Sequence, residues 1–126
     1  QATANAIAGY AGPLAAMSFN PNSVAEMARL APEVARGLVT CAYDPNVELL
    51  SGDTCTHLRE IPDYDRVGAS FISHDINDLT RSRVSELKNA GADVLCWTVR
   101  SSEQEKQARK IAQNITFESY LAPIPA

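Results

Sequence analysis

Short apolar runs alternate along the chain with stretches in which apolar residues recur at helical spacing. The runs lie at 14–19, 35–40, 67–72, 93–99 and 114–118. Between the first two, in segment 22–31, Val24, Met27 and Ala31 follow the i, i+3, i+7 rule of an amphipathic helix, with Asn22 or Ser23 as its N-cap. Repeated strand, helix and strand with short connections predicts a parallel sheet with right-handed crossovers.

Two more helices are expected in the second half of the chain. Segment 78–92 has an apolar side and ends at Gly91, where a helix C-cap belongs. Segment 101–114 starts with serines, carries Glu103 early and Lys110 late, and so matches the helix dipole. Segment 41–66 contains two prolines and predicts a long loop with one helix near 46–60. We therefore predict a single α/β domain over residues 1–126 with five parallel strands.

Composition narrows the class of protein. The chain has 126 residues, is 45% hydrophobic and carries a net charge of -4 without a basic run, which argues against a nucleic-acid surface. No apolar run approaches the roughly 18 residues of a membrane span. The chain begins without Met or a basic leader region, so we expect it to be a piece of a longer chain or to have lost a segment before Gln1.

The cysteines favour a reducing compartment. Cys41, Cys55 and Cys96 are odd in number and contain no CxxC pattern, which makes a zinc site and a full disulfide framework improbable. Cys96 lies inside an apolar run and is interpreted as a small buried hydrophobic residue. A cytoplasmic location is the prediction that fits this usage best.

Polar clusters follow each predicted strand, at 18–23, 40–46, 72–80, 97–102 and 116–120. Ligands of parallel α/β folds bind at the carboxyl ends of strands, although helix N-capping requires Ser, Asn and Asp at the same places. Capping does not require an aromatic ring, so Phe19 and Trp97 are the stronger candidates. Trp97 can form an apolar pocket wall with an N–H donor, or it can be core.

Catalytic groups are not identified by these patterns. His74 and Asp75 are adjacent on a strand and point to opposite faces, so the run Ser73-His74-Asp75 cannot form a triad. Asp75 and Asp78 are interpreted as helix caps, and His57 as an exposed loop residue. No pair of carboxylates predicts a metal site, and no phosphate-binding glycine motif is present.

The order of three short motifs resembles the bacterial branch of the glycerophosphodiester phosphodiesterase family. Ser18-Phe19 is followed by a helix, then by Arg36-Gly37-Leu38, and later by Trp97-Thr98-Val99 with a helix and a closing strand. The resemblance runs from about residue 13 and corresponds to the C-terminal portion of the family. The family's closing Thr-Asp-Arg-Pro pattern is replaced here by Thr116-Phe117-Glu118-Ser119, so the last strand end is lined differently.

This resemblance implies strands four to eight of a TIM barrel, a fold of about 250 residues. The implied reaction is metal-assisted hydrolysis of a glycerophosphodiester to an alcohol and glycerol 3-phosphate, with Mg²⁺ or Ca²⁺ in the complete enzyme. The family's catalytic histidines and metal ligands lie on the first three strands and have no counterpart here. The chain alone is therefore expected to bind no cation and to be inactive. Its substrate-binding candidates are Phe19, Trp97, Ser18, Ser73 and Asp75, which we place together on one rim.

Two other functions stay open at this point. The chain could be a non-enzymatic α/β module that binds a ligand or a partner, or part of a different TIM-barrel hydrolase or aldolase-type enzyme. If the barrel is complete, the expected partner is a small glycerophosphodiester substrate of lipid metabolism. Five strands of an eight-stranded barrel leave two sheet edges and an apolar interior uncovered, so we also expect the isolated chain to self-associate.

Overall fold

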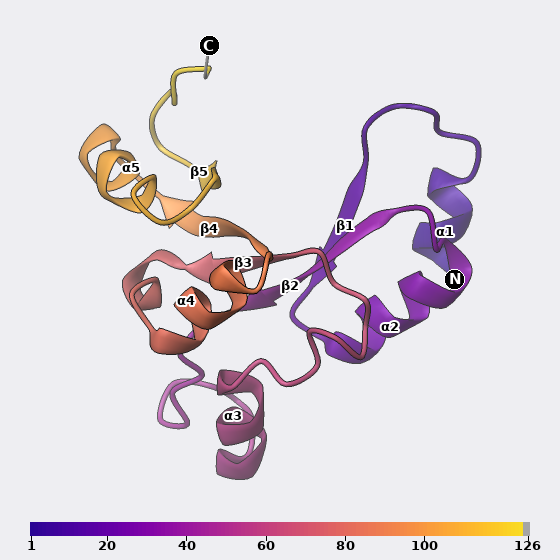
Figure 1. Cartoon of the computed structure of the whole chain (residues 1–126), viewed down its shortest axis with the longest axis horizontal. Helices are drawn as coiled ribbons and strands as arrows, with labels where there is room; N and C mark the ends of the chain where they lie inside the picture. Colours follow the sequence, from indigo (N-terminus) through magenta and orange to yellow (C-terminus); the bar gives the residue numbers. More distant parts are fainter. Residues whose placement is uncertain (125–126) are drawn as a thin grey trace.

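Five parallel strands form the centre of the molecule, as the sequence predicts. The computed structural model describes residues 1–124. The strands are β1 (Ala15–Ser18), β2 (Ala35–Thr40), β3 (Phe71–Asp75), β4 (Asp93–Val99) and β5 (Asn114–Phe117), and they neighbour one another in chain order. The sheet curls as it crosses the molecule (Figure 1), so that the described residues form a partial TIM barrel.

Three helices cover the outer face of the curled sheet. They are α2 (Pro21–Leu30), α4 (Ser82–Asn89) and α5 (Ser102–Ala108). The remaining helical elements are α1 (Ala2–Ile7), α3 (Gly52–Arg59) and the short 3₁₀ helix η1 (Ile76–Asp78). In Figure 1, α3 lies apart from the outer layer, beyond the end of β2. Helix α3 falls inside the predicted 46–60 window, whereas α1 was not predicted.

The main core lies between the sheet and its outer helices. It contains Val24 from α2, Val84 and Leu87 from α4, and the fully buried Ile72 and Val94 from the central strands. These residues lie on the face of the sheet that carries the even-numbered positions of β2, β3 and β4, because successive strand residues alternate between faces. The odd-numbered positions up to Trp97 therefore face the concave side, whereas Val99 returns to the core after an irregularity in β4.

Local signals fix most helix ends. Ser101 caps α5 through a bond from the Gln104 amide at 3.2 Å, as predicted. At the end of α4, Gly91 has a φ of 103° and the amide of Ala92 bonds back to Leu87, which is a Schellman motif. The predicted cap of α2 is wrong, because Asn20 caps the helix at the Asn22 amide and Pro21 occupies its first turn.

The third strand and the helix after it differ from their predicted positions. The apolar run 67–72 predicted the strand, yet β3 starts at Phe71 and extends through Asp75. Val67 is buried from a turn, in which its amide bonds to Asp63 and Gly68 has a φ of 59°. The predicted helix 78–92 begins only at Ser82, as α4, because the chain forms η1 up to Asp78. The predicted helix 101–114 ends as an α-helix at Ala108.

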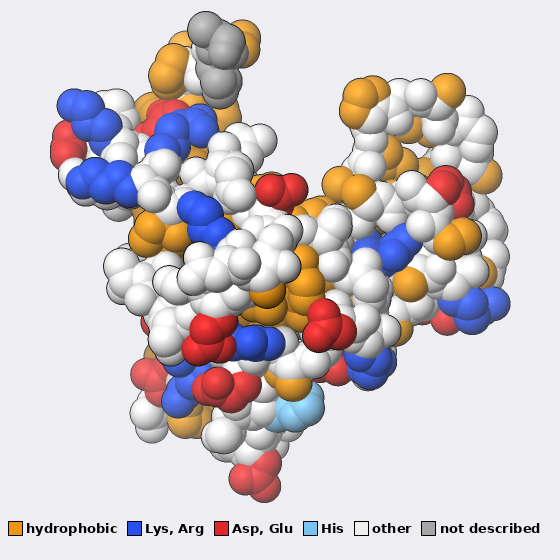
Figure 2. All heavy atoms as spheres, viewed as in Figure 1, with side chains coloured by type: hydrophobic (Ala, Val, Ile, Leu, Met, Phe, Trp, Pro, Cys, Tyr) orange, Lys and Arg blue, Asp and Glu red, His pale blue; other side chains and the backbone are white. Residues whose placement is uncertain are grey.

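The concave side of the sheet exposes apolar side chains. Met17 and Phe19 are each 49% exposed. Gly37 leaves space on this side for the ring of Phe71, because a Cβ atom there would lie 2.3 Å from that ring. Figure 2 shows the molecule hollowed between the arm that carries α1 and the arm that carries β5. In the described residues, β1 and β5 each pair with one neighbour only.

Candidate functional site

A pocket of about 780 Å³ lies at the carboxyl ends of β1, β2 and β4. This is the end of a parallel sheet where ligands bind. Its walls come from the residues after β1, from the β2–α3 connection, from α3 and from Trp97. The apolar part of the lining consists of Phe19, Pro21, Cys41, Tyr43, Val47, Leu49, Leu50, Leu58 and Trp97.

Phe19 and Trp97 meet in this pocket, although 77 positions separate them in the sequence. Their ring centroids lie 5.4 Å apart at an interplanar angle of 85°, an edge-to-face contact. The indole N–H of Trp97 donates to the Ser73 carbonyl at 3.0 Å, which fixes the ring against β3. The two aromatic residues that the sequence analysis selects therefore line one cavity, and the indole N–H is used inside the protein.

Tyr43 forms a rigid part of the same wall. It has a φ of 48°, in the left-handed region that a bulky side chain rarely adopts. Its ring is buried with Cys41 and Cys55, and its hydroxyl donates to the Val39 carbonyl at 3.2 Å. Arg59 of α3 donates to the carbonyls of Ala42 and Tyr43 at 2.8 and 3.0 Å. These contacts hold the β2–α3 connection and α3 over the end of the sheet.

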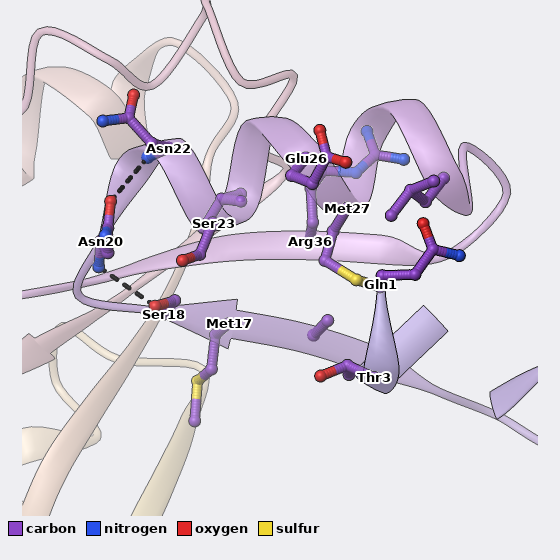
Figure 3. Close-up of a pocket in the computed structure, with 13 residues that line it drawn as sticks. Gln1, Thr3, Met17, Ser18, Asn20, Asn22, Ser23, Glu26, Met27 and Arg36 are labelled. Atoms are coloured by element: carbon purple, nitrogen blue, oxygen red, sulfur yellow. Dashed lines mark hydrogen bonds between the residues drawn. The ribbon is translucent and has the colours of Figure 1, made fainter. Parts of the chain in front are cut away.

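None of the three polar candidates, Ser18, Ser73 and Asp75, lines the pocket of the aromatic pair, although Asp75 neighbours Trp97 in the sheet. Ser18 pairs with Leu38 in register and lies on the outer face, where it lines a separate pocket of about 550 Å³ beside α2. Figure 3 shows its hydroxyl bonded to the Asn20 amide, while Met17 points away from α2. Ser73 is fully buried, and its hydroxyl has no hydrogen-bond partner among the described residues.

Asp75 lies beside Trp97 in the register between β3 and β4. One of its carboxylate oxygens accepts bonds from the backbone and side chain of Asn77 at 2.9 and 3.0 Å. Asp75 is thus the cap of η1, as expected. The cap expected for Asp78 is wrong, because its carboxylate binds His74 and Arg81 instead.

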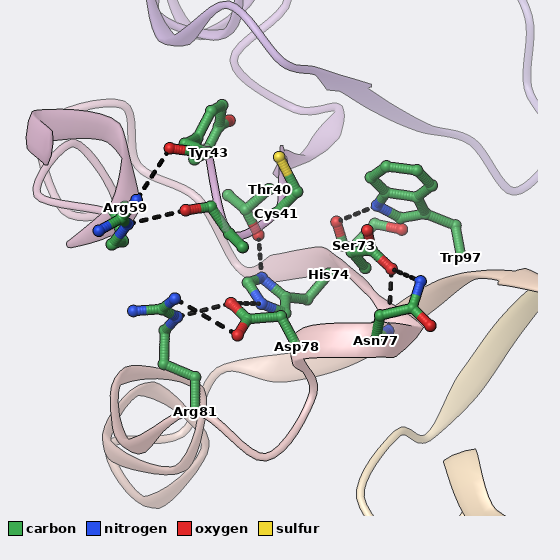
Figure 4. Close-up of polar contacts among 12 residues, drawn as sticks. Thr40, Cys41, Tyr43, Arg59, Ser73, His74, Asn77, Asp78, Arg81 and Trp97 are labelled. Carbon is green, nitrogen blue, oxygen red and sulfur yellow. Dashed lines mark hydrogen bonds and ion pairs between the residues drawn. The ribbon is translucent and has the colours of Figure 1, made fainter. Parts of the chain in front are cut away.

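His74 belongs to a buried cluster on the outer face of the sheet (Figure 4). Its Nδ1 lies 2.7 Å from the Thr40 hydroxyl, and its Nε2 lies 3.2 Å from the Asp78 carboxylate, which Arg81 binds at 2.6 Å. Burial lowers the pKa of His74 and outweighs the opposing effect of Asp78. A neutral ring with its proton on Nε2 satisfies both partners. Because this ring faces away from the pocket, His74 cannot act there as a base.

Two further reactive side chains, Cys41 and His57, line the pocket. Burial raises the pKa of the Cys41 thiol, which makes it a poor nucleophile. His57 is exposed, as predicted, but belongs to α3 and lies 3.4 Å from the Asp63 carboxylate at the pocket's outer rim. Within residues 1–124, no three His, Cys, Asp or Glu side chains gather as metal ligands would. The carboxylates of Asp75 and Asp78 do not fit a cation site, since they lie on opposite faces.

Sequence reasoning missed Tyr43, Leu58 and Arg59 as parts of this site. Tyr43 follows the end of β2 as Phe19 follows the end of β1, and that signal could have identified it. Leu58 and Arg59 reach the site through the long β2–α3 excursion, whose path no local pattern specifies. None of the helices in the described part of the chain is long and apolar enough to cross a membrane.

Comparison with solved structures identifies the same architecture. The chain resembles a phosphodiesterase from Oleispira antarctica, in complex with its product sn-glycerol-3-phosphate, at a TM-score of 0.67 and 20% identity, covering 92% of this chain and 43% of that one. It resembles a glycerophosphodiester phosphodiesterase from Parabacteroides distasonis at a TM-score of 0.53 and 20% identity, covering 80% of this chain and 37% of that one. No family model matches, and neither does any curated sequence.

These similarities are at the level of the fold. The resemblance that the sequence motifs indicate is confirmed there, because the structures that align with the chain are phosphodiesterases of the expected kind. The chain spans less than half the length of these two structures, 43% and 37%. The chain therefore matches part of such a barrel, and the order of its sequence motifs predicts that this part is C-terminal.

Proposed function

We propose that these 126 residues are the C-terminal part of a glycerophosphodiester phosphodiesterase. In the complete barrel they supply a wall of the substrate pocket, while the residues that act on the phosphate belong to the first three strands. The observation that carries this proposal is the contact between Phe19 and Trp97 at the carboxyl ends of β1 and β4, where both rings line one pocket.

The proposed reaction is hydrolysis of a glycerophosphodiester to an alcohol and glycerol 3-phosphate. Phe19 and Trp97 would pack against the glycerol or its alcohol substituent and exclude water from that side. A cation, Mg²⁺ or Ca²⁺, would be held by residues outside this chain, since its own carboxylates do not fit one. Three unpaired, buried cysteines suit a cytoplasmic enzyme of lipid metabolism.

The chain alone is expected to show no hydrolysis of glycerophosphocholine in the presence of Mg²⁺ or Ca²⁺. The measurement is release of glycerol 3-phosphate by the purified chain, compared with the polypeptide encoded by the reading frame that extends upstream of the Gln1 codon. That longer polypeptide should carry three further βα units and turn the substrate over. The assignment would be refuted by hydrolytic activity that co-purifies with the 126-residue chain and is lost in its Trp97→Ala variant.

A non-enzymatic binding module is the competing function. It predicts that the longer polypeptide, or the chain itself if no barrel half precedes it, binds glycerophosphodiesters without turnover. Equilibrium dialysis with glycerophosphocholine, run beside the activity assay, separates the two functions. Binding without product release would favour the module.

The isolated chain is expected to self-associate, because the edges of β1 and β5 and the apolar concave face are uncovered in the described residues. Sedimentation velocity should show dimers or larger species whose fraction rises with concentration. Met17→Lys places a charge on the concave face and should shift the distribution toward monomer. Leu121→Lys, at an exposed apolar residue after β5, is the matched control. A stable monomer at all concentrations would contradict the expectation.

A further inference from the structure

One side of the pocket continues outward as an apolar trough. We call it the β2–α3 trough, and it is formed by Tyr43, Val47, Leu49, Leu50 and Leu58. Its inner end is the pair Phe19 and Trp97. At its outer end Leu49 is fully exposed and Val47 is 77% exposed. Aliphatic side chains that line a cavity at one end and face water at the other gain free energy when an apolar group covers them.

The charged groups of the lining do not favour a charged occupant. Arg66 binds the Asp63 carboxylate at 2.6 Å, and His57 lies 3.4 Å from the same carboxylate. Glu48 faces the Cys41 thiol at 3.7 Å and adds a negative charge inside the lining. The positive charge of Arg66 is thus neutralised by Asp63, and the remaining charge of the lining, that of Glu48, is negative. A phosphate group is repelled from the trough, whereas an uncharged hydrocarbon chain is not.

The size of the cavity agrees with an elongated ligand. Its volume of about 780 Å³ lies within the roughly 300–1,000 Å³ of small-molecule sites, and it opens to solvent along the exposed leucines. Because Trp97 lines both the trough and the end of the curled sheet, an occupant of the trough is continuous with the proposed substrate site. A glycerophosphodiester whose phosphate lies near the barrel centre could extend a substituent along it.

We propose that the β2–α3 trough binds the single acyl chain of a lysophospholipid, so that the substrate class is a glycerophosphodiester carrying one hydrocarbon chain. This proposal rests on the proposed function for the position of the phosphodiester. The chain passes over Trp97 and Phe19 and leaves between Leu58 and Leu50. The short, fully polar glycerophosphocholine fills only the inner end and binds more weakly.

The lone Trp97 is a built-in reporter for this site. The 126-residue chain is titrated with lysophosphatidylcholines of increasing chain length, each kept below its micelle-forming concentration, and with glycerophosphocholine. Tryptophan emission should change with the lysolipids, and affinity should rise with chain length. Lysolipids brominated along the acyl chain should quench the emission more strongly than their unbrominated equivalents, because the bromines come into contact with the ring.

Leu50→Asp is the variant that tests the trough. It places a charge where the acyl chain passes and should weaken lysolipid binding at least about tenfold. Leu121→Asp changes an equally apolar, exposed residue outside the pocket and should leave binding unchanged. Far-UV circular dichroism of both variants checks that they fold. If Leu50→Asp loses structure, Val47→Asp replaces it, since that side chain is mostly solvated.

Several outcomes overturn the proposal: equal affinity for glycerophosphocholine and long-chain lysolipids, no dependence on chain length, equal effects of Leu50→Asp and Leu121→Asp, or a response only to phosphatidylcholine vesicles. The last would mean that the exposed leucines dock on a membrane surface. The proposed function is tested separately. If the longer polypeptide hydrolyses glycerophosphocholine but shows no dependence on acyl-chain length, the enzymatic function is supported and the acyl-chain site is refuted. If binding depends on chain length but no hydrolysis occurs, the acyl-chain site is supported and the enzymatic function is refuted.

Discussion

His74→Ala is expected to lower the free energy of unfolding by about 2–4 kcal/mol at pH 7. His74 is fully buried, so the change leaves a cavity against the sheet. It also leaves the Thr40 hydroxyl, 3% exposed, without the ring nitrogen that it contacts. A loss of this size is a large share of the 5–15 kcal/mol by which domains are typically stable.

Urea unfolding followed by far-UV circular dichroism measures this loss, with all proteins at one concentration because self-association affects apparent stability. His57→Ala is the matched control. It removes the chain's other histidine from an exposed position on α3 and should change stability by less than about 0.5 kcal/mol. Equal losses in the two variants would show that the His74 cluster is not a stabilising element.

The same cluster predicts how stability depends on pH. The folded-state pKa of His74 is lowered, so below about pH 6.5 the unfolded chain takes up a proton that the folded chain does not. Stability is therefore fully present above that pH and falls as the pH drops toward the folded pKa. The pKa of Asp78 is also lowered, since the bonds from Arg81 and His74 outweigh burial, and its contribution is lost at lower pH still. His74→Ala should lack the first of these two decreases.

The five strands could be predicted because apolar residues occupy both faces of a parallel sheet and so form continuous apolar runs, as in β4. The same rule failed at β3, where Ser73, His74 and Asp75 belong to the strand. The polar atoms of His74 and Asp75 are accommodated by the Thr40 and Asp78 contacts and by the cap of η1, and those partners are remote or follow later in the chain. The buried Ser73 hydroxyl has no partner among the described residues. The apolar Val67 belongs instead to a turn that packs into the core. A one-dimensional pattern does not distinguish these cases.

The candidate site was predictable only in part, for a similar reason. Phe19 and Trp97 could be selected because no helix cap requires an aromatic ring at a strand end. Ser18 could not be excluded without the register, which places it opposite Leu38 on the outer face. Leu58 and Tyr43 enter the site because Arg59 holds the β2–α3 connection through two backbone carbonyls. That long-range contact has no sequence signature of its own.

Trp97→Ala is expected to reduce stability by about 2–3 kcal/mol. The side chain is half-buried and packs against the cluster of Cys41, Tyr43 and Cys55, and its N–H bond to the Ser73 carbonyl is lost as well. Trp97→Phe keeps an aromatic ring and loses only the N–H bond and part of the contact area. It should therefore cost about 1 kcal/mol. Circular dichroism is the appropriate probe, because the variants have no tryptophan to follow.

The comparison of these two variants decides between the core and pocket roles that the sequence left open for Trp97. If the ring of Trp97 serves mainly as core, Trp97→Phe and Trp97→Ala should each lower stability in proportion to the contact area that they remove. Neither variant should then change ligand affinity. The edge contact with Phe19 in the pocket predicts instead that Trp97→Ala weakens ligand binding in the complete barrel by more than its stability loss accounts for, and raises KM. Phe19→Ala should reproduce the binding loss with a smaller loss of stability, since Phe19 is 49% exposed. Unchanged KM in both alanine variants would assign Trp97 to the core and remove the pocket wall from the proposed function.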